Sequence, residues 1–118
     1  MSPHTVLLVD NDESITKSFA RILEKHGYST DIARTGKEAL QKASTKFYTF
    51  ALIDIFLPDI HGTELLEQLP DRDKMIKIII TGFPKSTMKN ADAYLEKPVR
   101  PQDLLALMKE KIEQKTRI

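Results

Sequence analysis

The chain has 118 residues, of which 41% are hydrophobic and 30% charged, and this length and balance fit one globular domain. Its net charge of +1 predicts no strong attraction to nucleic acid or to a membrane surface, and no apolar run approaches the roughly 20 residues that cross a bilayer. The lack of Cys excludes a disulfide framework and thiolate chemistry, and no basic segment precedes the first apolar run, so we expect no signal peptide and a cytoplasmic location.

The first 27 residues predict a strand followed by a helix. Residues 5–10, TVLLVD, form a short apolar run rich in residues that favour β-structure. The segment after it repeats apolar residues at helical spacing, namely Ile15, Phe19, Ile22 and Leu23. Asp12 or Ser14 can cap the start of this helix, and Gly27 fits its end.

Strand and helix patterns continue to alternate through the middle of the chain. Residues 28–33 alternate polar and apolar side chains, which predicts a strand near an edge of the sheet. Residues 36–44 predict a second helix. Residues 50–56 are apolar on both faces, as expected of a buried strand. A loop with Pro58 and Gly62 then leads into a short third helix.

The last third of the chain predicts two strands and a long helix. Residues 75–81 predict a buried fourth strand, and residues 93–96 predict a short fifth one. Residues 82–92 lie between them, are polar, and contain at most one helical turn. The helix that follows Pro98 and Pro101 has an apolar stripe. This stripe consists of Leu104, Leu105, Met108 and Ile112.

Strands that alternate with helices predict an α/β fold, with a parallel sheet covered by helices on both faces. With right-handed crossovers, the common arrangement for five strands is the doubly wound, flavodoxin-like sheet in the order 2-1-3-4-5. Ligands bind to such sheets beyond the carboxyl ends of the strands, at the crevice between the first and third strands. The polar residues just after each strand are therefore the candidates for a functional site.

Polar side chains do follow four of the five predicted strands directly. They are Asp10, Asn11 and Asp12 after the first strand, Asp54 at the third, Thr81 at the fourth and Lys97 after the fifth. Clustered carboxylates with an amide oxygen suit Mg²⁺, which keeps coordination positions open for phosphate. A carboxylate beside this ion can attack a phosphoryl group and form an aspartyl phosphate, while an ammonium and a hydroxyl hold the phosphoryl oxygens.

Four segments, in order and near the expected spacings, are similar to the motifs of response-regulator receiver domains, the CheY-like family of two-component signalling. They are VDND (9–12), DIFLPDIHG (54–62), IIITG (78–82) and ADAYLEKP (91–98). The resemblance covers nearly the whole chain. It implies a signalling phosphoprotein that works in a phosphorelay and catalyses only its own phosphorylation and dephosphorylation.

The resemblance also implies a role for each residue. Asp54 would accept the phosphoryl group from a sensor histidine kinase or a phosphotransfer protein. Mg²⁺ would be held by Asp10, Asn11, Asp54 and the backbone carbonyl of Phe56. Thr81 and Lys97 would contact the phosphoryl group, and Tyr94 would swing inward as Thr81 moves, which makes these two residues a conformational switch.

The chain departs from the family pattern at two places. The second position of the acidic pair is usually Asp, and the neutral amide of Asn11 stands there instead, so we expect weaker Mg²⁺ binding. Only 16 positions separate Thr81 from Lys97, which predicts a shortened fourth helix. Because many receivers form dimers through that helix, we do not carry over their mode of dimerisation and expect a monomer.

Residues 1–118 are expected to form a single receiver domain with no output domain. The output would then be a contact with a protein or onward phosphotransfer, with the downstream protein unknown, unless the chain is a piece of a longer regulator. We expect no binding to nucleic acid or membrane.

Three alternatives remain open from the residues alone. The first is a Mg²⁺-dependent phosphohydrolase of the haloacid-dehalogenase type, with Asp10 as the nucleophile and Asp12 as the acid/base, although this leaves Asp54 without a role. The second is a protein-binding module that works without phosphate. The third assigns each residue an ordinary structural role, such as a helix cap for Asp12 and simple packing for Tyr94. The residues His4, His26 and His61 are expected at the surface.

Overall fold

The computed structural model describes residues 4–70, 75–82 and 91–116. The strands are β1 (Thr5–Val9), β2 (Ser29–Ala33), β3 (Phe50–Asp54), β4 (Ile76–Thr81) and β5 (Ala93–Glu96). The helices in the described residues are α1 (Glu13–Lys25), α2 (Gly36–Thr45), α3 (Gly62–Gln68) and α4 (Pro101–Thr116). The strands pair in parallel in the order β2-β1-β3-β4-β5, which confirms the predicted doubly wound, flavodoxin-like α/β sheet.

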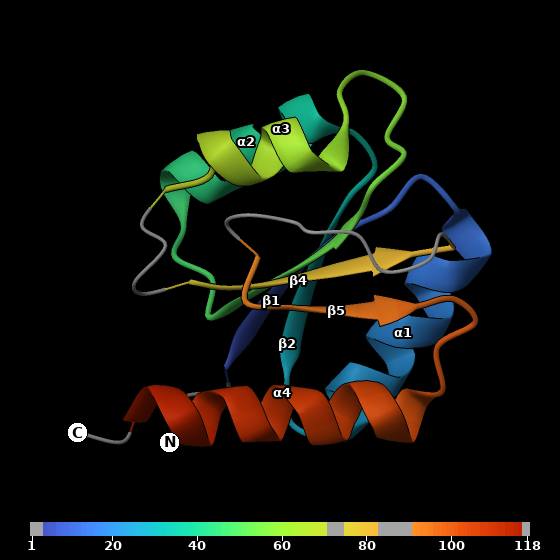
Figure 1. Ribbon diagram of the computed structural model, residues 1–118, viewed down its shortest axis with the longest axis vertical. Coiled ribbons are helices and arrows are strands. Elements are labelled where there is room, and N and C mark those ends of the chain that lie inside the picture. The colour runs from blue at the N-terminus through green and yellow to red at the C-terminus, as the bar shows by residue number, and fades with distance from the viewer. Residues whose placement is uncertain (1–3, 71–74, 83–90, 117–118) are drawn as a thin grey trace.

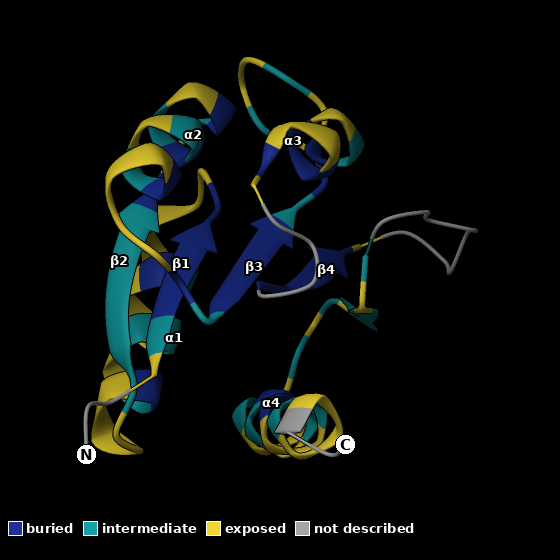
Figure 2. Cartoon of the chain, turned by 90° about the vertical axis from the view of Figure 1, so that its left-hand side faces the viewer, coloured by how far each residue is buried: buried dark blue, intermediate teal, exposed yellow. Residues whose placement is uncertain are grey.

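Helices cover both faces of the sheet, with α2 and α3 on one side and α1 and α4 on the other (Figures 1 and 2). Successive side chains of a strand point to opposite faces. In β1, Leu7 and Val9 therefore belong to the apolar layer under α2 and α3, while Val6 and Leu8 belong to the layer under α1 and α4. This arrangement explains why the central strands carry apolar side chains on both faces rather than at every second position.

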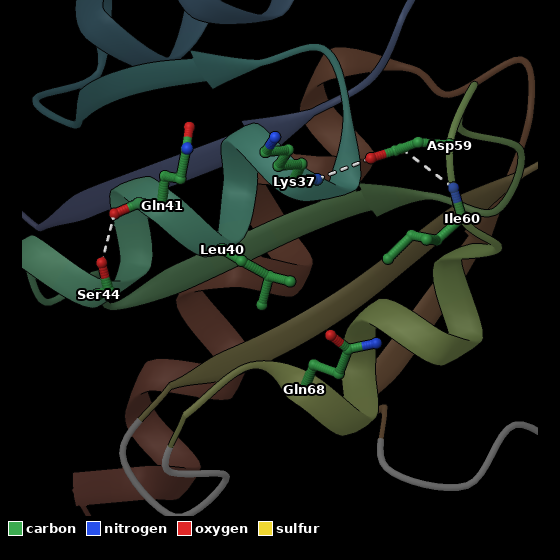
Figure 3. Close-up of a pocket in the computed structure, with 7 residues that line it drawn as sticks. All are labelled: Lys37, Leu40, Gln41, Ser44, Asp59, Ile60 and Gln68. Carbon is green, nitrogen blue, oxygen red and sulfur yellow. Dashed lines mark hydrogen bonds between the residues drawn. The ribbon is translucent and has the colours of Figure 1, made fainter.

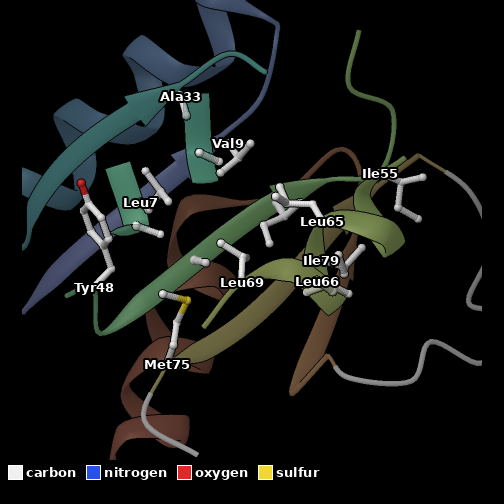
Figure 4. Packing of buried hydrophobic residues seen from close by; sticks show 14 residues of the cluster. Leu7, Val9, Ala33, Tyr48, Ile55, Leu65, Leu66, Leu69, Met75 and Ile79 are labelled. Carbon is white, nitrogen blue, oxygen red and sulfur yellow. The ribbon is translucent and has the colours of Figure 1, made fainter. Parts of the chain in front are cut away.

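The layer beneath α2 and α3 is closely packed (Figure 4). Leu7 and Ile79 of the sheet are fully buried there, as are Leu65 and Leu66 of α3. Each such side chain contributes about 1.5–3 kcal/mol relative to an exposed one. The two edge strands differ: β2 and β5 are only partly buried, because each has a neighbour on one side alone. The predicted edge position of residues 28–33 is thus confirmed.

Local side chains fix where the helices begin and end. The Asp12 carboxylate accepts the amide hydrogens of Ser14 (3.0 Å) and Ile15 (3.2 Å), so Asp12 is the predicted cap of α1. Gly27 follows the end of the same helix with a φ of +92°, a conformation that favours glycine. Thr35 caps α2 in the same way, by accepting the amide hydrogen of Glu38.

Some predicted boundaries were wrong by one or two residues. The predicted strand 50–56 ends at Asp54, because the chain turns there and the Gly62 amide donates back to the Ile55 carbonyl (2.6 Å). The predicted strand 5–10 ends at Val9. The shortened helix expected between the fourth and fifth strands falls largely on residues 83–90, which lie outside the described residues. Within the described ranges, no helix is both long and apolar enough to cross a membrane.

A buried lysine in β4 was not expected from the sequence pattern. The side chain of Lys77 is fully buried. Its ammonium lies 3.5 Å from the carbonyl oxygens of Leu66 and Leu69, at the carboxyl end of α3. A cation is favourable there, because the last carbonyls of a helix carry partial negative charge and lack partners within the helix.

Gly62 allows α3 to begin directly against the strand that carries Asp54. A Cβ added at Gly62 would lie 2.7 Å from the Asp54 carbonyl oxygen and 2.8 Å from the Ile55 Cα. Both are backbone atoms and cannot rotate away. Gly62→Ala is therefore expected to lower the free energy of unfolding by about 1–3 kcal/mol, as overpacking does. Urea unfolding followed by circular dichroism measures this difference.

Gly82→Ala is the matched control, because a Cβ at Gly82 meets no described atom within 4 Å. A loss of stability in the Gly82 variant as large as in the Gly62 variant would contradict the steric argument.

Candidate functional site

Parallel pairing brings the carboxyl ends of four strands to one edge of the sheet. Val9 pairs with Ile53, so Asp10 and Asp54 follow these two residues on neighbouring strands. On the other side of β4, the Lys97 amide donates to the carbonyl of Thr81 (2.7 Å). The predicted convergence of Asp10, Asp54, Thr81 and Lys97 is therefore present in the structure.

The Lys97 ammonium joins the two acidic strand ends. It lies 3.3 Å from Oδ2 of Asp10 and 3.6 Å from Oδ1 of Asp54. The Asp10 and Asp54 side chains are only 6% and 13% exposed, so little water screens them. One ammonium thus faces two carboxylates, and the arrangement leaves negative charge to be compensated when both carboxylates are ionised.

The surroundings of Asp54 disfavour its ionised form. Burial raises the pKa of the Asp54 carboxyl above its ordinary value, and the nearby charge of Asp10 raises it further. The Lys97 ammonium and the Phe56 amide act in the opposite direction without cancelling the rise in pKa. A further cation at this position would favour the ionised form of Asp54, which is the form that can act as a nucleophile.

The side chains at this edge offer oxygen ligands, the type that Mg²⁺ prefers. In the described part of the chain, no three His, Cys, Asp or Glu side chains form a cluster that could hold a metal ion. Mg²⁺ is commonly held by only one or two carboxylates, with waters and phosphate oxygens completing its shell. Asp10 and Asp54 offer two such carboxylates at this edge, and Asn11, the residue after Asp10, is exposed.

The structure separates the two carboxylates that lie so close in the sequence. Asp10 faces Lys97 with one oxygen and accepts the Asp12 amide with the other (2.9 Å). Asp12 instead turns to α1, and its hydrogen bonds from the Ser14 hydroxyl and the Ile15 amide lower its pKa. Asp12 therefore serves as a helix cap, and this leaves Asp10 as the acidic side chain of the site after β1.

The two predicted switch residues lie in different surroundings. Thr81, at the end of β4, is 1% exposed. Tyr94 pairs with Ile79 in the sheet, is partly buried, and packs against the apolar layer under α2 and α3. The packing role considered for Tyr94 is thus present, whereas its movement stays a prediction.

A closed loop between β3 and α3 forms one rim of the site. Phe56 forms an isolated bridge with His61, and their rings meet edge to face with centroids 5.7 Å apart. His61 is exposed, as predicted, but it also caps α3 by accepting the Thr63 amide on Nδ1 (3.3 Å). This capping role was not predicted from the sequence, and the position of His61 directly before a helical pattern is the signal that could have indicated it.

Comparisons with known proteins relate the chain to one protein family. The family model "Response regulator receiver domain" matches residues 6–109. A solved CheY-like receiver domain protein from Methanospirillum hungatei is 42% identical with a TM-score of 0.86, and the match covers 97% of each chain.

Two curated relatives are a probable transcriptional regulator, ycf29, of Porphyra purpurea and the regulatory protein PhoP of Bacillus subtilis. They are 35% and 33% identical over 90% and 88% of this chain. The chain spans only 55% and 46% of their lengths, about half of each relative.

Proposed function

Because the chain belongs to the response regulator receiver domain family of two-component systems, we propose that it receives a phosphoryl group on Asp54. The donor would be a sensor histidine kinase or a phosphotransfer protein. The observation that supports this most directly is the Lys97 ammonium within 3.3 Å and 3.6 Å of the Asp10 and Asp54 carboxylates. A surface lysine usually keeps its ammonium in water, whereas that of Lys97 contacts two nearly buried carboxylates.

The chemistry needs few protein groups. An Asp54 oxygen forms a bond to phosphorus while the bond from phosphorus to the donor atom breaks, and the electron pair of that bond leaves with the donor. Lys97 and the Thr81 hydroxyl would hold phosphoryl oxygens, Lys97 as a point charge and Thr81 as a hydrogen-bond donor. Mg²⁺ would be bound by Asp10, Asn11, Asp54 and the Phe56 carbonyl, and it would neutralise charge during the transfer.

The product would act as a switch rather than as an enzyme intermediate. A phosphoryl group adds negative charge beside Lys97 and Thr81, and this charge favours a conformation in which both residues contact it. Tyr94 would follow Thr81 inward. We propose a cytoplasmic monomer without affinity for nucleic acid or membrane, which passes the signal through a protein contact or onward phosphotransfer. The single-domain organisation stays a prediction, since the curated relatives are about twice as long as this chain.

The phosphohydrolase alternative has less support. It requires Asp12 as a mobile acid/base, and Asp12 instead caps α1 with three hydrogen bonds to Ser14 and Ile15. It also leaves the contact between Asp54 and Lys97 without a function.

Acetyl phosphate tests the proposed function without knowledge of the natural kinase. The protein is incubated with this donor, with Mg²⁺ or with a chelator, and its intact mass is measured. We expect one added phosphoryl group that depends on Mg²⁺ and that maps to Asp54 after digestion. Mapping to Asp10 together with turnover of phosphate monoesters would support the phosphohydrolase, and the absence of any label would support the phosphate-independent module.

The neutral amide at position 11 gives a prediction about metal affinity. Asn11→Asp adds an anionic oxygen to a site that would hold Mg²⁺, so it is expected to tighten Mg²⁺ binding about tenfold. Titration of Mg²⁺ followed by amide chemical shifts measures the dissociation constant. The control is Glu67→Gln on the exposed side of α3, which removes one negative charge away from the site and is expected to leave Mg²⁺ affinity unchanged. Equal affinity in the wild type and Asn11→Asp would contradict the prediction.

A further inference from the structure

The loop between β3 and α3 is joined by the side chain of Asp59 to α2, a helix distant in sequence. The Oδ1 of Asp59 accepts the Gly36 amide at 2.8 Å. Its Oδ2 accepts the Lys37 amide at 2.9 Å (Figure 3). These are the first two amides of α2, which lack partners within their helix. Asp59 lies 22 and 23 positions further along the chain. Asp59, five positions after Asp54, therefore caps α2, although its loop leads into α3 and not into α2.

The hydrogen bonds to Asp59 are made to its ionised form. The Gly36 amide, followed by the Lys37 amide, lowers the pKa of the Asp59 carboxyl. The Asp59 carboxylate also accepts the amide of Ile60 (3.0 Å), which turns the chain at this point. At neutral pH the ionised Asp59 can therefore accept these hydrogen bonds, and both of its oxygens accept from backbone amides.

Apolar packing accompanies this anchor. Ile60 lies so close to Gly36 that a Cβ there would come within 2.4 Å of the Ile60 Cγ1. Ile60 also lines a groove of about 360 Å³ between α2 and α3, together with Lys37 and Leu40 of α2 (Figure 3). Ile60 and Leu57 of the same loop also pack against the apolar layer under α2 and α3, so apolar packing and the Asp59 hydrogen bonds together hold the loop against α2.

At its other end the same loop carries the predicted metal-binding carbonyl. Phe56 is bridged to His61, and the Gly62 amide donates to the Ile55 carbonyl, so the loop is closed at its base. Between these points, Asp59 makes the polar contacts that join the loop to α2 in the described structure. Asp59 lies only three positions after Phe56, so release of Asp59 from α2 would loosen the short segment that leads back to Phe56.

We propose that Asp59 is a positioning residue of the phosphorylation site, which fixes the Phe56 carbonyl for Mg²⁺ by anchoring the loop of residues 55–61 to α2. The inference rests on the proposed function in so far as it concerns Mg²⁺. Groups that orient metal ligands without touching the metal commonly change affinity about 10- to 100-fold when removed. Asp59 touches neither the metal nor the phosphoryl group, so its effect would be exerted through the loop.

Thr35→Ala provides a matched control for Asp59→Ala. Thr35 caps the same helix through the Glu38 amide (3.0 Å), but no contact joins its side chain to the loop among the described hydrogen bonds. Both variants remove hydrogen bonds from the first turn of α2, and only Asp59→Ala releases the loop. Asp59→Asn keeps one acceptor oxygen and is expected to restore part of the lost effect.

Two measurements test the proposal. Hydrogen exchange of the Gly62 amide, without metal or phosphodonor, reports opening of the loop, and we expect about tenfold faster exchange in Asp59→Ala than in the wild type or Thr35→Ala. Titration with Mg²⁺ alone, followed by amide chemical shifts, is expected to give about tenfold weaker binding in Asp59→Ala and unchanged binding in Thr35→Ala.

An unchanged exchange rate of the Gly62 amide in Asp59→Ala would overturn the proposal. So would an equally large loss of Gly62 protection and of Mg²⁺ affinity in Thr35→Ala, because Asp59 would then act only as a helix cap. Failure of the proposed function has a different result. The wild type would then neither bind Mg²⁺ nor accept a label, whatever the exchange at Gly62. Faster exchange without a change in Mg²⁺ affinity would show an anchored loop that does not position a metal ligand, and would also reject the inference.

Discussion

Asp54→Asn is expected to abolish labelling by acetyl phosphate and, at the same time, to stabilise the folded protein at neutral pH. The amide is not a nucleophile towards phosphorus, so no phosphoryl group should be added at any Mg²⁺ concentration. The stabilisation has an electrostatic origin. The Asp54 carboxylate is nearly buried and lies close to Asp10, with Lys97 shared between them.

The sign of the pH dependence follows from the raised pKa of Asp54. Its ordinary value is 3.8, and burial and the Asp10 charge raise it in the folded state. The folded protein therefore holds this proton more tightly than the unfolded chain, and the wild type loses stability as the pH rises from 3.8 through the folded-state pKa. The advantage of the Asp54→Asn variant over the wild type should be smallest at low pH and reach on the order of 1 kcal/mol at neutral pH.

Urea unfolding at several pH values measures this difference, and Asp31→Asn is the control with the opposite sign. The Tyr48 hydroxyl, followed by the Lys46 ammonium, lowers the pKa of Asp31. Asp31→Asn should therefore be less stable than the wild type at neutral pH, and this deficit should fade as the pH falls towards and below the folded-state pKa. An Asp54→Asn protein that is labelled, or that is less stable than the wild type at neutral pH, would contradict the assignment.

Lys97→Met is expected to slow labelling by acetyl phosphate about 10²- to 10³-fold, the usual effect of removing one donor that stabilises developing charge. It should also lower the free energy of unfolding at neutral pH by about 1–3 kcal/mol, because two nearly buried carboxylates lose the cation between them. As the pH falls below the raised pKa of Asp54, this carboxyl is protonated, and the loss of stability should become smaller. Initial labelling rates and urea unfolding at two pH values measure both effects.

Lys17→Met is the matched control for the loss of a charged lysine. Lys17 pairs with Glu13 at 2.9 Å, but both side chains are more than half exposed, and surface pairs contribute little. We expect Lys17→Met to change the labelling rate and the unfolding midpoint far less than Lys97→Met does. If Lys97→Met behaves like Lys17→Met in both measurements, the ammonium between Asp10 and Asp54 has no part in the chemistry.

The chain order of strands and helices was predictable because it depends on local patterns. Apolar runs of strand length alternate with helical spacing, and this alone requires a covered parallel sheet. The meeting of Asp10, Asp54 and Lys97 followed from the same reasoning, although Lys97 and Asp10 lie 87 positions apart. Parallel strands present their carboxyl ends at one edge, so residues just after each strand must lie near one another once the strand order is known.

The tertiary structure alone decided which individual groups make contact. The sequence left Asp12 as either a catalytic or a capping residue, and only the path of the chain into α1 assigned it to the cap. The buried Lys77 and the anchor from Asp59 to α2 were not foreseen, since each joins a side chain to backbone groups of another element. Periodicity predicts which face of an element is buried, but a hydrogen bond depends on positions within a few tenths of an ångström, which the packing of whole elements determines.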